Sequence, residues 1–221
     1  MVDYQNIVIE LTITRKKIQN AFAELKVLDY QRLQNIRSYL ATKNTENLQR
    51  FKDETIASNI DFENIEKSFH QVLGYVLLME KEGHKHPLFK ELLKRSEVMR
   101  EILQALFKQQ KKQVAIASSL KKGRWNFVSE IQEKRLVRSL RKEQDLVTVL
   151  AGVYKHEKER VKAIFEAYEH EKKKQAMVAA AAVAAWTVPA LGTALSLSIF
   201  AAYDWANESS KNYKLLLELS K

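Results

Sequence analysis

The chain contains no cysteine and only two prolines and five glycines among its 221 residues. Without cysteine it has no disulfide, no thiolate nucleophile and no thiolate metal ligand, although either redox compartment stays open. Scarce proline and glycine leave few turn positions, so the composition favours long helices over a turn-rich β architecture. The N-terminus has no basic segment followed by an apolar one, so we expect no cleavable signal peptide.

The motifs of several enzyme classes are also missing. We find no phosphate-binding glycine loop, no nucleophile elbow and no zinc-protease motif. His84 and His86 flank a lysine in a predicted turn, but a metal site needs three or four converging ligands. We therefore expect no enzymatic activity, no metal site and no cofactor.

Apolar residues recur at helical spacing through residues 1–175. One face carries Ile7, Leu11, Ile18, Phe22 and Leu25, although the run at 7–9 would also suit a short strand. A second face, spaced 3, 4, 3, 4 and 3, is coiled-coil-like and carries Phe62, Ile65, Phe69, Val72, Val76 and Met79. The helix starts expected from capping residues are Asp29, Asn44 or Thr45, and Asn59 or Asp61.

Two breaks divide the helical pattern further. Gly83 to Pro87 is the clearest one, because glycine suits a helix end and proline suits a helix start. A second break is predicted at 122–124, and a long helix follows from Asn126 toward Lys174. The sequence therefore predicts an all-α fold, in which residues 1–175 form an elongated antiparallel bundle of coiled-coil-like hairpins.

A stretch of 28 residues without any charge, 176–203, follows the predicted bundle. A bilayer core about 30 Å thick needs roughly 20 apolar residues in a helix, so we expect a membrane segment here. Three forms stay open: a single tilted or kinked span, a helical hairpin turning at 189–192, or a buried helix pair in a globular core. The residues expected to insert are Met177, Val178, Val183, Trp186, Val188, Pro189, Leu191, Gly192, Leu195, Leu197, Ile199 and Phe200.

The flanks of this stretch suit a membrane interface. Lys172, Lys173 and Lys174 precede it, and Tyr203 and Trp205 stand at its end, where aromatic belts form. Residues 204–221 are expected to form a short amphipathic tail.

Charge is distributed unevenly along the chain. Residues 81–175 hold 24 Lys and Arg against 13 Asp and Glu, whereas residues 1–80 hold 10 against 11. Clusters of basic residues mark a solvated helix face, an anionic-lipid surface or a nucleic-acid surface. The residues expected to bind an anionic surface are Lys108, Lys111, Lys112, Lys121, Lys122, Arg124, Arg135, Arg138 and Lys142. Arg135, Arg138 and Lys142 share one helix face by their spacing.

These features predict a membrane-anchored or membrane-associated helical scaffold or adaptor that acts through helix–helix interactions. Its expected partners are anionic lipids and either further copies of itself or another helical protein. The positive-inside tendency would keep the N-terminal bulk cytoplasmic. Nucleic acid is the less favoured partner, because no aromatic stacking series accompanies the basic clusters.

Two alternatives stay open. A long-helix bundle with an alanine-rich apolar element is similar in organisation to the α-pore-forming cytolysins and the pore-forming colicins, although no residue motif matches. This resemblance implies a protein that inserts into membranes conditionally and that would be secreted by a non-classical route. The other alternative is a structural subunit of a larger assembly.

Overall fold

The computed structural model describes residues 4–81, 87–122, 126–175 and 184–218, which form five long helices and no strand. The all-α prediction is confirmed. In chain order the helices are α1 (Tyr4–Thr42), α2 (Thr45–Lys81), α3 (Pro87–Lys122), α4 (Asn126–Gln175) and α5 (Ala184–Glu218).

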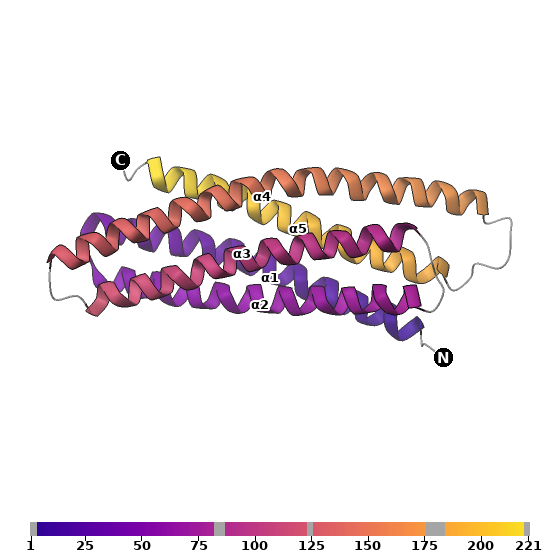
Figure 1. Ribbon diagram of the computed structural model, residues 1–221, viewed down its shortest axis with the longest axis horizontal. Coiled ribbons are helices and arrows are strands. Elements are labelled where there is room, and N and C mark those ends of the chain that lie inside the picture. The colour runs from indigo at the N-terminus through magenta and orange to yellow at the C-terminus, as the bar shows by residue number, and fades with distance from the viewer. Residues whose placement is uncertain (1–3, 82–86, 123–125, 176–183, 219–221) are drawn as a thin grey trace.

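The helices lie side by side in an elongated bundle (Figure 1). Successive helices run in opposite directions, so α1 to α4 form the expected antiparallel hairpins. The last helix, α5, packs between α4 and α1 and runs parallel to α1. Lys26 of α1 pairs with Glu208 of α5 at 2.5 Å, and three residues further on Asp29 accepts a hydrogen bond from Ser209.

The apolar faces predicted from spacing form the core. Every residue named on the first predicted face is buried in α1, and those named on the second are buried in α2 as far as the described side chains extend. Met79 has a side chain outside the described part. Trp205 of α5 joins these faces, because its ring lies 5.8 Å from that of Phe22 and 5.6 Å from that of Phe62.

Three of the predicted helix boundaries are confirmed. Asn44 caps α2, since its side-chain oxygen accepts the backbone N–H of Glu46 at 2.8 Å. Lys43 in the preceding turn has a positive φ of 57°, which ends α1 sharply. Pro87 begins α3 and Asn126 begins α4, as the two breaks predicted.

The helix starts predicted at Asp29 and at Asn59 or Asp61 are wrong. Asp29 lies within α1, and Asn59 and Asp61 lie within α2. All three residues are buried. Capping residues also serve as core hydrogen-bonding groups when a bundle supplies partners, and sequence pattern does not separate the two uses.

The C-terminal region differs from its predicted division. A hairpin turning at 189–192 is wrong, because α5 runs unbroken through Pro189 and Gly192. Residues 204–218 are the second half of the same helix rather than a separate surface tail. They bury Trp205, Ala206 and Tyr213 in the core, and this packing gives the segment the stability that an isolated short helix lacks.

Over the described residues, no helix is both long enough and apolar enough to cross a membrane. Of the residues expected to insert, Met177, Val178 and Val183 lie outside the described residues. Ile199 is buried in the bundle, and Leu197 and Phe200 are half-buried. The others lie on α5 with side chains outside the described part: Trp186, Val188, Pro189, Leu191, Gly192 and Leu195.

The predicted interfacial residues have varied places. Trp205 lies inside the bundle and is only 1% exposed, so it does not stand at a lipid boundary in this conformation. Tyr203 is half-buried, and its ring lies under the Lys158 ammonium at 5.1 Å. Lys172, Lys173 and Lys174 belong to the last turns of α4, with side chains outside the described part.

Candidate functional site

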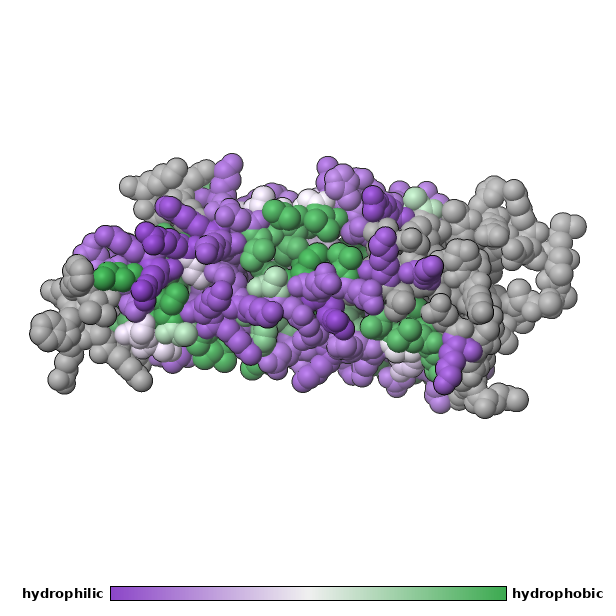
Figure 2. Space-filling view, in the orientation of Figure 1, coloured by the Kyte–Doolittle hydropathy of each residue, from purple (hydrophilic) through white to green (hydrophobic). Residues whose placement is uncertain are grey.

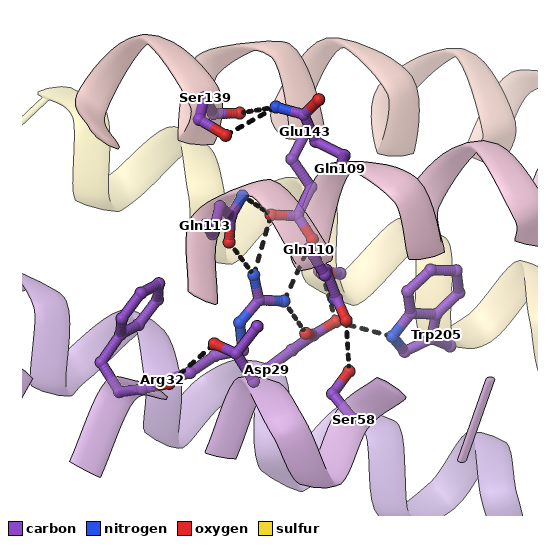
Figure 3. A network of polar contacts seen from close by, with 12 residues as sticks. Asp29, Arg32, Ser58, Gln109, Gln110, Gln113, Ser139, Glu143 and Trp205 are labelled. Atoms are coloured by element: carbon purple, nitrogen blue, oxygen red, sulfur yellow. Dashed lines mark hydrogen bonds and ion pairs between the residues drawn. The ribbon is translucent and has the colours of Figure 1, made fainter. Parts of the chain in front are cut away.

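A buried charge network lies in the interior of the bundle, between the helices (Figure 3). Arg32 of α1 is fully buried and donates to both carboxylate oxygens of Glu143 on α4, at 3.0 and 2.8 Å. The same guanidinium donates to Asp29 at 2.7 Å and to the Gln113 side-chain oxygen at 2.7 Å. One cation is thus held between two carboxylates inside the core.

All five helices contribute to the network. Gln110 of α3 donates to Glu143 at 3.0 Å and accepts from Ser58 of α2 at 3.0 Å. On the other side, Asp29 accepts the indole N–H of Trp205 at 2.7 Å and the hydroxyl of Ser209 at 2.9 Å. Asp29 therefore links α1 to α5, whereas Glu143 links α1 and α3 to α4.

The two carboxylates experience different fields. Burial, reinforced by the charge of Glu143, raises the pKa of Asp29 above its ordinary value, although Arg32 opposes the rise. Burial also acts against the ionised form of Glu143, but Arg32 and several hydrogen bonds outweigh it, so the pKa of Glu143 falls below its ordinary value. Glu143 is therefore the carboxylate that stays ionised more readily beside Arg32.

This network is structural rather than catalytic. Arg32, Asp29 and Glu143 are each at most 1% exposed, so no substrate can contact them without opening the bundle. The sequence carried a signal for the network that the capping interpretation missed. Asp29 and Arg32 continue the 4 and 3 spacing of the apolar face between Leu25 and Ile36, which places polar residues at core positions.

A basic groove lies on the surface above this network, between α3 and α4. Its volume is about 230 Å³, and it is lined by Gln109, Lys112, Ile116, Arg135, Arg138, Ser139 and Lys142. None of these residues is acidic. Two of them are buried in its floor, where the Gln109 amide donates to the backbone oxygen of Ser139 at 2.9 Å and to its hydroxyl at 2.7 Å.

The groove brings together four of the residues expected to bind an anionic surface: Lys112, Arg135, Arg138 and Lys142. The predicted common face of the last three is confirmed. Lys108 and Lys111 are exposed on the same helix as Lys112, and Lys111 lies 4.0 Å over the Phe107 ring. Lys121 and Lys122 end α3 with side chains outside the described part, and Arg124 lies outside the described residues.

A second groove flanks α4 on its other side, toward α1. Its volume is about 310 Å³, and it is lined by Leu40, Glu130, Glu133, Lys134, Val137, Arg138 and Arg141. Here acidic residues offset the cations, since Glu130 pairs with Lys134 at 2.7 Å and Glu133 pairs with Lys43 at 2.5 Å. In the basic groove, no acidic residue among those described lines the groove or pairs with its four cations.

No cluster of three or more His, Asp and Glu residues that could hold a metal occurs in the part of the chain that the structure describes. His84 and His86 lie outside that part. His70 and His156 are exposed.

We expect Arg32→Ala to lower the free energy of unfolding by roughly 3–5 kcal/mol, because it leaves Asp29 and Glu143 buried without their cation. Urea denaturation followed by circular dichroism measures the change. Arg37→Ala, on the exposed side of α1, is the matched control and should change stability by at most about 0.5 kcal/mol. Equal losses in the two variants would show that the network does not hold the core.

A pH effect is expected from a buried carboxyl outside the network, that of Asp61. Burial and the neighbouring Glu24 raise the pKa of Asp61 to about 6, well above its unfolded value. The folded state therefore binds the proton more tightly, and its stability falls as pH rises through about 6. Between pH 5 and 7.5 the melting temperature of the wild type should drop more than that of Asp61→Asn, which does not titrate. Parallel pH profiles for the two proteins would contradict this assignment.

The sequence matches no protein-family model, and it shows no significant similarity to a curated protein or to a solved structure. The function must therefore be inferred from the residues and their geometry.

Proposed function

We propose that the protein is a helical scaffold that docks on an anionic membrane surface through α3 and α4 and binds a helical partner through other faces. The observation that supports docking is the gathering of exposed cations on α3 and α4, in and beside the basic groove. Exposed Lys108, Lys111, Lys112, Arg135, Arg138, Arg141 and Lys142 have no ion pair among the described residues. Each such residue near an anionic bilayer contributes about 1 kcal/mol of attraction.

The bundle would dock on its side. The residues that line the basic groove lie in the second half of α3 and the first half of α4, near the turn that joins them. The uncharged first half of α5 starts at the opposite end of the bundle (Figure 1). The 34 residues of α4 from Lys142 to Gln175 span roughly 50 Å. An upright bundle could therefore not bring both regions to one bilayer surface, but a bundle lying along α4 could.

The outer faces of α1 and α2 suit the partner. Eight large apolar side chains are exposed there among the described residues: Ile9, Ile13, Val27, Tyr30, Ile56, Ile60, Leu77 and Leu78. Exposed apolar side chains of this size are the groups that a helical partner would cover. The N-terminal 80 residues are also nearly neutral, so they would not repel a second copy or another helical protein.

A matched pair of charge variants tests the docking. Arg135→Gln with Arg138→Gln should weaken cosedimentation with vesicles containing phosphatidylserine about thirtyfold, since two contacts of about 1 kcal/mol are lost. Lys16→Gln with Lys67→Gln removes the same charge from the exposed faces of α1 and α2, and it should leave binding nearly unchanged. Equal weakening by both pairs, or binding to purely zwitterionic vesicles, would sink the proposal.

Conditional insertion is a second candidate function, and the packing of α5 favours it. Residues 184–203 are uncharged, and the bundle buries Ala194, Ile199 and Ala202 from this half of α5. An apolar helix stored against α1 and α4 would be available to a membrane if the bundle opened.

Liposomes loaded with a self-quenched dye test this second function. A conditional inserter should release dye from anionic liposomes, and a disulfide engineered between α5 and α1 should suppress that release until it is reduced. Intact liposomes at every lipid composition and pH would exclude insertion and leave surface docking as the function.

A further inference from the structure

The floor of the basic groove presents a hydrogen-bond donor as well as surface charge. Ser139 is 7% exposed, and its oxygen accepts the Gln109 amide at 2.7 Å. The hydroxyl proton of Ser139 has no acceptor among the described contacts, so it can be donated to a group in the groove. The Gln109 amide donates to both the backbone oxygen and the hydroxyl oxygen of Ser139 and so fixes the position of that hydroxyl.

The walls of the groove carry four positive charges. Lys112 stands on α3, and Arg135, Arg138 and Lys142 stand on α4 across from it. Their mutual repulsion is not offset by any acidic lining residue or by any ion pair among the described residues. A bound anion would relieve this repulsion, and the planar guanidinium groups suit the oxygens of a phosphate.

We propose that this groove is a discrete site for a phosphomonoester dianion, in which Ser139 donates from the floor and the four cations surround the phosphate. The inference rests on the proposed docking function and specifies the headgroup chemistry that the docking would select. A phosphomonoester carries a charge of about −1.5 to −2 near neutral pH and has three terminal oxygens, whereas a phosphodiester carries a single charge. The excess of cations and the buried donor favour the first.

The size of the groove supports one bound group per chain. Its volume of about 230 Å³ admits a phosphate with a small attached alcohol but not a folded polynucleotide. Ile116 at the lining gives the attached carbon skeleton an apolar contact. A phosphorylated glycerol headgroup and a free phosphorylated metabolite share this chemistry, and they can be separated by experiment.

Isothermal calorimetry of the full chain tests the site with three probes: short-chain phosphatidic acid, short-chain phosphatidylglycerol and inorganic phosphate. We expect saturable binding of phosphatidic acid with one site per chain and at least tenfold weaker binding of phosphatidylglycerol. Comparable binding of inorganic phosphate would identify free phosphate compounds as the source and still support the site. Equal affinity for the monoester and the diester, or non-saturable uptake, would overturn the proposal.

A substitution that changes no charge separates this site from general electrostatic attraction. Ser139→Ala should weaken phosphatidic acid binding about tenfold, in line with the loss of one hydrogen bond to a charged group. Ser118→Ala is the matched control, because Ser118 bonds to the Val114 carbonyl of its own helix and does not line the groove. If Ser139→Ala keeps the wild-type affinity for phosphatidic acid and the wild-type melting temperature, the Ser139 hydroxyl does not bind the phosphate, and the proposed discrete site is overturned.

The two proposals can fail separately. Ser139→Ala should still cosediment with phosphatidylserine vesicles as the wild type does, because those vesicles offer only phosphodiesters. If the wild type fails to dock on phosphatidylserine vesicles but binds soluble phosphatidic acid, the proposed scaffold function is refuted and the phosphate site is supported. If the wild type docks on the vesicles but binds phosphatidic acid no better than phosphatidylglycerol, the phosphate site is refuted and the docking function is supported.

Discussion

The bundle depends on one buried cation. Arg32 is charged at every physiological pH, and taking it out of water is unfavourable unless its charge and its N–H groups find partners. Asp29, Glu143 and Gln113, from three helices, supply partners for its two terminal nitrogens. The buried Nε of Arg32 has no partner among the described contacts. Because these partners must meet at one point, the network fixes how far each helix slides along its neighbours, which apolar packing alone specifies less sharply. Such networks often contribute more to uniqueness of the fold than to its stability.

The sequence predicted those parts of the fold that follow from local pattern. The apolar faces of α1 and α2, the break before Pro87 and the cap at Asn44 all depend on residues close together in the chain. The place of Asp29 does not, because its partners Trp205 and Ser209 lie far away in sequence. The common face of Arg135, Arg138 and Lys142 was predictable because these residues are close together in the sequence. Their proximity to Lys112 of α3 was not, because it depends on how α3 packs against α4.

The structure also changes the meaning of the uncharged stretch near the C-terminus. Read along the sequence, a basic region leads directly into an apolar one. In space, the groove residues lie in the first half of α4, whereas α5 begins beside the far end of α4 (Figure 1). The two features therefore lie toward different ends of the bundle. In the coloured part of Figure 2, hydrophilic residues predominate, with apolar patches between them.

The parallel pairing of α5 with α1 has a consequence for how the chain folds. Asp29 and Ser209 are separated by 180 residues, and their contact closes the ring of helices. Contacts of such long range are slow to form, because loop-closure entropy must be overcome before they add stability. During synthesis α1 to α4 emerge first, with Asp29 still lacking Trp205 and Ser209. Until α5 has been synthesised, the faces of α1 and α4 that it covers have no partner within the chain and are accessible to a chaperone or a membrane.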